Sequence, residues 1–569
     1  MNTLRKRILI LVGIFTFSGC EFTEPDNLTF IEDHEVYNNI DKIRYVLNTV
    51  YSGLPSGYSV IGASSLAAAT DEAEEVNGMQ AIQDFNIGNI TPYSNPDDVW
   101  NKNFEAIRNA QVFLQSTDTI TWKALEFANP PEYILRVGLL DQYRAEAKFL
   151  IAFFYFDLIK RYGGVPIVDT VINKNSDWVS DFPRKSFAEC VEYIVSKCDE
   201  AALTLLPTQG EGSWGRATKG AALALKARTL LYAASDLYNQ PGNTDPLRGY
   251  VDGNRQERWI EAAKANKVVI DLGQYSFHSQ YEDLFLLGTA KSNEVIFERR
   301  FGSSNSFEKS NTPIGFQFGA TGTCPTQDLV DAYEHMDDGD FNWNNPVHAA
   351  NPYDNRDPRL AKTIVTNLST FGKFNTTVEL WNGGLNGKPR DRASKTGYYL
   401  RKYMDEELDL LLGETSAKQW IYFRFPEIYL NYAEAMNEAF GPSATGPATL
   451  DMTALDAINA VRTRAAVGIG VIDPGVNQQE LEDKIRSERR VELAFETHRY
   501  WDARRWMIAD QVIGGTVRGV NIIKEGTDSF TYSPFTVEER TWNDRLYYYP
   551  IPQGEVNKSN GVIVQNLSW

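Results

Sequence analysis

Cysteine and histidine are scarce in this 569-residue sequence, which holds four and five of them. No CxxC pair and no histidine cluster occurs along the chain, so a zinc site is not expected. We predict no bound metal and no cofactor. Cys190 and Cys198 lie eight residues apart in one predicted helix, about 12 Å along its axis, which is too far for a disulfide. A disulfide framework is therefore not expected.

Positive charge is in deficit as well. Lys and Arg number 56 against 75 Asp and Glu, which gives a net charge of −19. A surface this acidic repels nucleic acid and anionic lipid headgroups, so nucleic acid is excluded as a partner. Nucleotide-binding and hydrolase motifs are also missing, since the sequence has no GxxxxGK[ST] loop, no GxGxxG turn and no Gly-x-Ser-x-Gly elbow. We therefore predict no catalytic residues and no enzyme.

The first twenty residues resemble a bacterial lipoprotein signal. Basic residues 5–7 precede an apolar run over residues 8–17 that is too short to span a bilayer. The run ends in small residues before Cys20, as in a lipobox, so residues 1–19 are predicted to be removed and Cys20 to carry a lipid anchor, a palmitate-type modification. A plain signal peptide with a chance cysteine is the alternative. Residues 20–30 are predicted to be a flexible tether, and no later segment approaches a membrane-spanning run.

Helical periodicity dominates the remaining chain. Small residues, mostly alanine, recur inside the periodic segments and permit close helix crossings. The pattern resembles tetratricopeptide packing, although no clean period of about 34 residues is present. We predict a mainly α fold, a tetratricopeptide-like scaffold of helical hairpins, with helices over residues 41–54, 98–113, 144–162, 187–206, 218–238, 258–272, 419–440, 455–464 and 478–506.

Residues 274–415 have a different composition. A short apolar run over 294–301 predicts a strand, and the rest is rich in Gly, Asn, Asp, Thr and aromatic residues. Long loops inside a large domain usually serve function. We predict an N-terminal helical scaffold over 31–273, an inserted loop-rich, ligand-facing lobe with minor β structure over 274–415, and C-terminal helices over 416–569 that complete the same fold. Residues 507–547 are predicted to be irregular.

A series of motifs along the chain resembles the SusD/RagB family of outer-membrane nutrient-binding lipoproteins. Each motif is weak alone, but they occur in family order over nearly the whole mature chain, behind the lipobox. They occupy residues 144–166, 217–232, 325–333, 355–360, 424–435, 486–506, 549–552 and 565–566.

The resemblance implies a tetratricopeptide-like scaffold with an irregular ligand-facing lobe. It also implies lipid anchoring at the cell surface, in the outer membrane, and a SusC-like TonB-dependent transporter as the partner. The implied function is capture of an oligosaccharide and its delivery to that transporter; some relatives handle peptides instead. A surface-anchored polysaccharide hydrolase and a pure protein-interaction scaffold are the alternatives.

The candidate ligand site depends on loop residues. Trp, Tyr and Phe number 12, 28 and 30, more than a helical core needs. Exposed rings offer apolar faces to the C–H faces of sugars, and nearby amides bind hydroxyls. For each single ring, packing within its own loop is the alternative. The candidates are Trp343, Trp381, Tyr353, Tyr58, Tyr93 and Asp71.

Other conspicuous residues receive structural interpretations. Trp100, Phe104, Tyr155 and Trp506 are assigned to the core, and Cys324 to a buried thiol. The acidic run over 337–340 lacks the EF-hand pattern and is predicted to be a solvated turn, with a calcium site as the alternative. Paired carboxylates over 488–502 suggest a glycosidase, but their spacing to arginine is i,i+3. That spacing predicts ion pairs along one helix, namely Arg489–Glu492, Glu496–Arg499 and Arg499–Asp502.

Overall fold

The computed structural model describes residues 36–172, 181–288, 290–447 and 449–569. The predicted signal peptide, the tether and the lipidation candidate Cys20 lie outside the described residues. Within the part of the chain that the structure describes, no helix combines the length and the apolar character that a membrane crossing requires.

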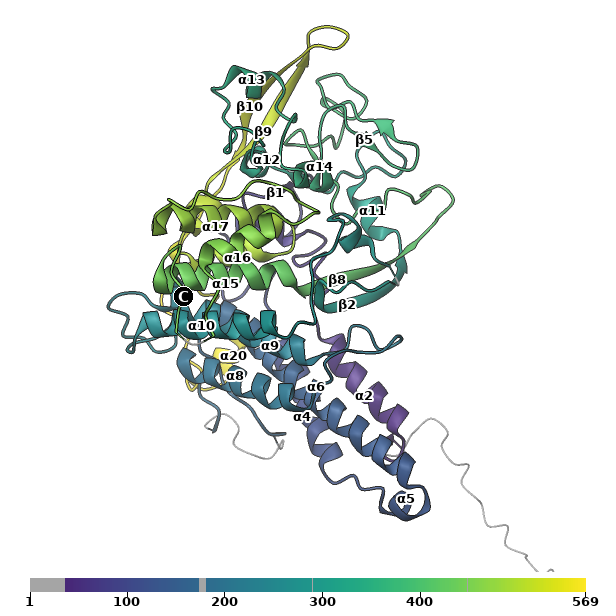
Figure 1. Ribbon diagram of the computed structural model, residues 1–569, viewed down its shortest axis with the longest axis vertical. Helices are drawn as coiled ribbons and strands as arrows, with labels where there is room; N and C mark the ends of the chain where they lie inside the picture. The colour runs from purple at the N-terminus through teal and green to yellow at the C-terminus, as the bar shows by residue number, and fades with distance from the viewer. Residues whose placement is uncertain (1–35, 173–180, 289, 448) are drawn as a thin grey trace, which may run out of the picture.

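Helices stack side by side through the lower and middle parts of the molecule (Figure 1). The N-terminal helices are α2 (Ile40–Ser52), α3 (Gln83–Asn86), α4 (Trp100–Asp118), α5 (Lys123–Ala128), α6 (Pro130–Tyr162), α8 (Phe187–Thr204), α9 (Lys219–Ala234) and α10 (Arg255–Asp271). The C-terminal helices are α15 (Phe425–Phe440), α16 (Ala454–Arg462), α17 (Gln478–Glu492), α18 (His498–Arg505), α19 (Ala509–Val512) and α20 (Gln553–Lys558). Contacts run from α4 through α6, α8, α9 and α10 to α15, on which α16 and α17 pack. The C-terminal helices thus continue the N-terminal stack, and the predicted mainly α scaffold is confirmed.

Helix α6 lies at the centre of the stack. Its second half is buried on almost every side, and Phe149, Phe154 and Tyr155 have no exposed surface. The helix begins at Pro130 rather than at residue 144, because Pro130 occupies its first turn and the side chain of Asn129 accepts the backbone N–H of Glu132. This first part is largely exposed, so its apolar periodicity is weak.

The residues assigned to the core are buried or packed on it. Trp100 and Tyr155 belong to the main cluster, and Phe104 packs against it. Trp506 is buried elsewhere, where its indole N–H donates to Glu434 of α15 (2.8 Å). Among the described residues, Cys190, Cys198 and Cys324 are buried free thiols, which confirms the interpretation of Cys324.

The longest strand of the lobe is β2 (Val295–Ser304), which confirms the predicted strand and pairs antiparallel with β8 (Ser416–Arg424). The predicted helix over 419–440 is wrong in its first residues: Gln419–Arg424 belongs to β8, and helix α15 begins only at Phe425. The run Trp420-Ile-Tyr-Phe has the aromatic and β-branched residues that strands favour. Arg424, the last residue of the strand, also occupies the N-cap position of the helix, so the two elements join without a loop.

The remaining described elements, in the lobe and in the segments outside it, are short. The strands are β1 (Ala73–Glu75), β3 (Thr323–Pro325), β4 (Ile364–Val365), β5 (Thr370–Phe371), β6 (Thr376–Thr377) and β7 (Tyr399–Leu400), paired β1–β3, β4–β7 and β5–β6. Short helices are α11 (Ser306–Asn311), α12 (Gln327–Ala332), α13 (Pro346–Ala350) and α14 (Arg359–Thr363). Single 3-10 turns are η1 (Leu66–Ala69), η2 (Asp236–Tyr238), η3 (Asp283–Leu286) and η4 (Asp544–Tyr547).

A β-hairpin replaces much of the segment that was predicted to be irregular. Strands β9 (Thr516–Lys524) and β10 (Phe530–Glu539) pair antiparallel and project at the top of the molecule beside α13 (Figure 1). The prediction for residues 507–547 is therefore wrong over these strands. Their alternation is hard to recognise, because Gly519 interrupts the apolar positions of β9 and a bulge between Thr536 and Glu538 shifts the register of β10.

The predicted helix over 478–506 is broken in two. Helix α17 ends at Glu492 and α18 begins at His498, and between them Phe495 (φ 62°) and Thr497 (φ 69°) adopt left-handed backbone conformations. A continuous helix is impossible at two such residues.

The i,i+3 ion pairs predicted along this helix are consequently wrong. Glu492 is fully buried and pairs with Arg424, Arg464 and Arg359, which come from three other segments. Arg489 pairs with Asp502 across the break. These charges link separate segments of the fold in its interior, where rigid, paired carboxylates make poor general acids.

Candidate functional site

Two of the sequence candidates pack against the β9–β10 hairpin, and a third is linked to it through one side chain. Trp381 packs on Phe530, at 5.3 Å between ring centroids. Tyr353 packs edge-on against Tyr532 at 5.4 Å. Trp343 is half-buried, and its indole N–H donates to Asp331 (3.0 Å), which in turn lies 3.4 Å from Arg518 of β9. The hairpin therefore contacts the rings of Trp381 and Tyr353 directly, and it is linked to Trp343 through Asp331 and Arg518.

Asp71 and Tyr93 lie apart from these rings. The Asp71 carboxylate pairs with Arg490 at 2.8 Å and with Arg499 at 2.9 Å. Burial alone would raise the pKa of Asp71, but the two guanidinium groups hold it below its ordinary value. Tyr93 is 84% exposed in a turn closed by Thr91 and Ser94. Asp71 thus already has charged partners within the chain.

Tyr58 lines a pocket with a volume of about 510 Å³, which we call the ring pocket. Its floor consists of Tyr58, Phe301 of β2 and Phe307 of α11, all half-buried, with the Tyr58 ring 6.0 and 5.0 Å from the two phenyl rings. The Tyr58 hydroxyl donates to the backbone carbonyl of Gln419, which holds the ring in place. A rigid apolar floor of this size suits a small ligand with flat apolar faces.

Polar groups surround the rings. Asn77 and Arg392 are exposed at the rim, and Gln80 is half-buried. Within the described chain, the Gln80 side-chain amide forms no hydrogen bond, so its donors and its acceptor can serve a ligand. Rings that stack and amides that bind hydroxyls are the two elements that a sugar requires.

The charged groups of the ring pocket are mostly engaged within the protein. Lys418 is buried and pairs with Glu308. Glu75 is 6% exposed, its carboxylate accepts the backbone N–H of Asn77 (3.4 Å), and burial raises its pKa above the ordinary value. Among the described lining residues Glu75 is the only carboxylic acid. Glycoside hydrolysis uses two flanking carboxyl groups, so the lining of the ring pocket supplies half of that machinery.

Sequence reasoning found only Tyr58 of the ring pocket. Phe301 stood at the end of the predicted strand, where alternation alone does not tell which face is open. Phe307, Gln80 and Arg392 carried no signal, because the pocket is assembled from segments far apart in the sequence, several of which become neighbours through the β2–β8 and β1–β3 pairings.

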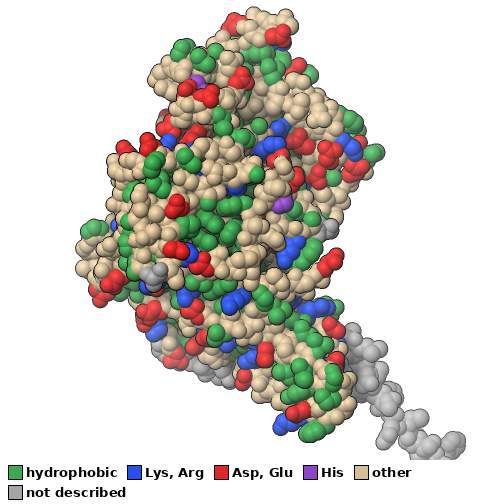
Figure 2. Space-filling view, in the orientation of Figure 1, with side chains coloured by type: hydrophobic (Ala, Val, Ile, Leu, Met, Phe, Trp, Pro, Cys, Tyr) green, Lys and Arg blue, Asp and Glu red, His purple; other side chains and the backbone are tan. Residues whose placement is uncertain are grey.

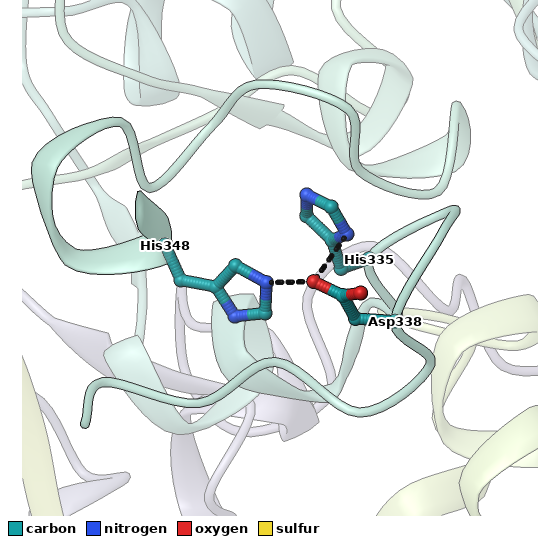
Figure 3. A group of neighbouring side chains, drawn as sticks. All are labelled: His335, Asp338 and His348. Carbon is teal, nitrogen blue, oxygen red and sulfur yellow. Dashed lines mark hydrogen bonds and ion pairs between the residues drawn. The ribbon is translucent and has the colours of Figure 1, made fainter. Parts of the chain in front are cut away.

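Two histidines approach one carboxylate in the turn that follows α12 (Figure 3). Asp338 lies 2.8 Å from Nε2 of His348 and 3.6 Å from Nδ1 of His335, and the imidazole rings stack at 4.3 Å. Sequence spacing did not indicate this cluster. The backbone N–H of Asn342 donates to Nδ1 of His348 (3.2 Å), which places the ring proton on Nε2, facing Asp338.

A metal ion could bind Nε2 of His348 only if the proton on this nitrogen were lost or moved to Nδ1. Metal-bound histidines normally donate the other ring N–H to an acceptor, whereas here the other nitrogen faces the N–H donor of Asn342. Asp338 also belongs to the predicted solvated turn, which the structure confirms as a tight turn closed between His335 and Gly339. The cluster is thus arranged as a hydrogen-bonded clip across residues 335–348.

Comparisons with known proteins agree along almost the whole chain. The model of the SusD family matches residues 293–569, and a model described as "Starch-binding associating with outer membrane" matches residues 27–231. The SusD-like protein P25 of Formosa agariphila is 23% identical, with 89% of this chain and 90% of that protein covered.

Solved structures give the same result. A SusD-like protein from Bacteroides fragilis has a TM-score of 0.77 at 26% identity, covering 95% of this chain and 99% of that one. A SusD-like carbohydrate-binding protein from the same species has a TM-score of 0.72 at 24% identity, covering 92% and 98%. The chain therefore belongs to the SusD/RagB family.

Proposed function

We propose that this protein captures oligosaccharides in the ring pocket and hands them to a SusC-like TonB-dependent transporter in the outer membrane. The observation that carries the proposal is the floor of Tyr58, Phe301 and Phe307 beside the uncommitted amide of Gln80. Apolar ring faces and amides together fit the mixed surface of a sugar. Family membership and the carbohydrate-binding neighbour support the same ligand class.

We propose binding without turnover. The charged residues over 488–502 that suggested a glycosidase are ion-paired inside the fold. Glycoside hydrolysis needs a second carboxyl group on the other side of the glycosidic bond, and among the described lining residues Glu75 has no such partner. A hydrolase would release reducing sugar from the bound polysaccharide and would lose that activity in the Glu75→Gln variant.

The anchor and the transporter belong to the same proposal. Lipid on Cys20 would hold the protein at the outer-membrane surface, where a transporter can receive its ligand. Replacement of Cys20 by alanine is expected to release the protein from the membrane fraction. Co-purification of a TonB-dependent barrel with the wild-type protein, from detergent-solubilised outer membranes, tests the partnership.

Affinity electrophoresis in gels that contain soluble starch, laminarin, xylan or pectin tests the ligand class. The protein from residue 21 onward is expected to be retarded by one of them. Gln80→Ala and Arg392→Ala are each expected to weaken binding about fivefold, the value of roughly one hydrogen bond. Arg108→Ala, an exposed arginine of α4, is the matched control. Retardation by none of the glycans, together with saturable binding of peptides, would favour the peptide-binding alternative of the family.

A further inference from the structure

A second polar hollow lies beside the β9–β10 hairpin. Its volume is about 520 Å³, and we call it the hairpin groove. One wall is the segment 382–397 and the other is the hairpin, which contributes Asn521, Ser533 and Phe535. None of the described residues that line this groove also lines the ring pocket, and the groove has no role in the proposed function so far.

Backbone pairing fixes the two walls relative to each other. The N–H of Asn382 donates to the carbonyl of Ile522 (2.9 Å), and the N–H of Val520 donates to the carbonyl of Thr396 (2.7 Å). The two ends of segment 382–397 are thus attached to the free edge of β9. The side-chain amide of Asn382 donates to the side-chain oxygen of Asn521 (2.9 Å), so these two amides also join the two walls.

The register of the hairpin aims several side chains into the groove. Asn521 lies opposite Ser533, so both project from the same face of the hairpin, and Phe535 follows two residues later on that face. The Phe535 ring is half-buried, with the Lys388 ammonium 4.5 Å from its centroid. The groove therefore offers a ring, amides and a hydroxyl together, as the ring pocket does.

The charge of the hairpin groove differs from that of the rest of the protein. None of its described lining residues is acidic, although the chain carries 75 Asp and Glu. Figure 2 shows acidic side chains spread over the visible face, with a group at the upper right over the region of β5 and α11. A carboxylate-free lining accepts neutral sugar units, and acidic ones as well, without repulsion.

One segment connects the two sites. Arg392 of segment 382–397 lines the ring pocket, whereas Lys388 and Asn386 of the same segment line the hairpin groove. Asn386 also borders a third hollow of about 420 Å³ that contains the rings of Phe316 and Phe374. The three hollows therefore surround a single loop of the lobe.

We propose that the hairpin groove is a second glycan-binding site, which holds further sugar units of a chain already bound in the ring pocket. The proposal rests on the proposed function and extends it to polysaccharide chains. Two sites joined by one ligand raise the effective concentration at the second site, so affinity increases with chain length without stronger contacts at the first site.

The test compares long and short ligands. Binding is measured by isothermal titration calorimetry with the polysaccharide that retards the wild-type protein and with a trisaccharide of the same linkage. Asn521→Ala and Ser533→Ala are the groove variants, and Thr536→Ala, an exposed hydroxyl of β10 outside the groove, is the control. Thermal melts verify that each variant is folded. Ser533 is exposed and forms no hydrogen bond through its side chain within the described chain, so its removal leaves the hairpin pairing unchanged.

The groove variants are expected to lose about fivefold in affinity for the polysaccharide and nothing for the trisaccharide. Arg392→Ala is expected to weaken both ligands. Unchanged polysaccharide affinity in both groove variants would overturn the second site while leaving the proposed function intact. Equal losses for the trisaccharide would also overturn it, since the groove would then be the primary site. Wild-type protein that binds no glycan would overturn both proposals.

Discussion

Glu72 is a carboxyl group buried without a partner, immediately before the strand that leads to the ring pocket. It is 1% exposed, and within the described chain neither of its oxygens accepts a hydrogen bond. Burial and then the charge of Asp71 raise its pKa from 4.5 to about 8, against the opposing effect of Arg499 and Arg490. Glu72 is therefore protonated in the folded protein over most of the neutral range.

The sign of the pH dependence follows from this raised pKa. The stability that the protonated carboxyl contributes is complete below about pH 4.5, where the unfolded chain is also protonated, and it is lost as the pH rises through 8. The difference between 8 and 4.5, at about 1.4 kcal/mol per pKa unit, gives at most about 5 kcal/mol. Glutamine has the same shape and no charge, so Glu72→Gln should avoid this loss.

The assay is urea unfolding of wild type and Glu72→Gln at pH 5, 6.5 and 8. The stability advantage of the variant over wild type is expected to grow by a few kcal/mol between pH 5 and pH 8. The exposed Glu105→Gln variant should show no such growth. A difference between Glu72→Gln and wild type that is equal at all three pH values would refute the reasoning.

Three further predictions concern the scaffold and the clip. Glu492→Gln removes the charge that three buried arginines share and should cost about 3–5 kcal/mol in urea unfolding; a loss below about 1 kcal/mol would contradict a buried network. Gly57→Ala would place Cβ 2.0 Å from the ring of Trp420 at a φ of +80°, so it should destabilise the protein by about 1–3 kcal/mol and alter its tryptophan fluorescence; an unchanged spectrum would argue against this contact. Because Nδ1 of His348 accepts the N–H of Asn342, neither Zn²⁺ nor EDTA should shift the Tm by more than about 1 °C; a rise of several degrees with Zn²⁺ would disprove the clip.

The helical scaffold could be predicted because its information is local. Helices α2, α4, α8 and α10 each bury one periodic face, and caps such as Ser186 with Glu189 mark their starts. Continuous burial does not by itself separate a helix from a strand, and the prediction failed at one such segment. Residues 419–424 are buried continuously, so a strand and a helix give the same apolar run.

The candidate site could not be predicted to the same extent, because its information is non-local. Phe301 and Tyr58 lie in contact only after β2 pairs with β8 and the loop at Gly57 passes over Trp420. Ring counts and loop composition indicated aromatic residues as candidates, but they could not distinguish Trp381, which packs on Phe530, from Phe307, which lines the ring pocket. Likewise, His335 and His348 meet at Asp338 through the path of a turn that no spacing rule specifies.

The most direct test of the central claim is a crystal structure of the protein with the oligosaccharide that it binds. We expect electron density for a sugar ring against Phe301 and Phe307, with a hydroxyl within hydrogen-bond distance of the Gln80 amide. A sugar bound only elsewhere, with the ring pocket filled by water, would contradict the assignment of the ring pocket as the capture site.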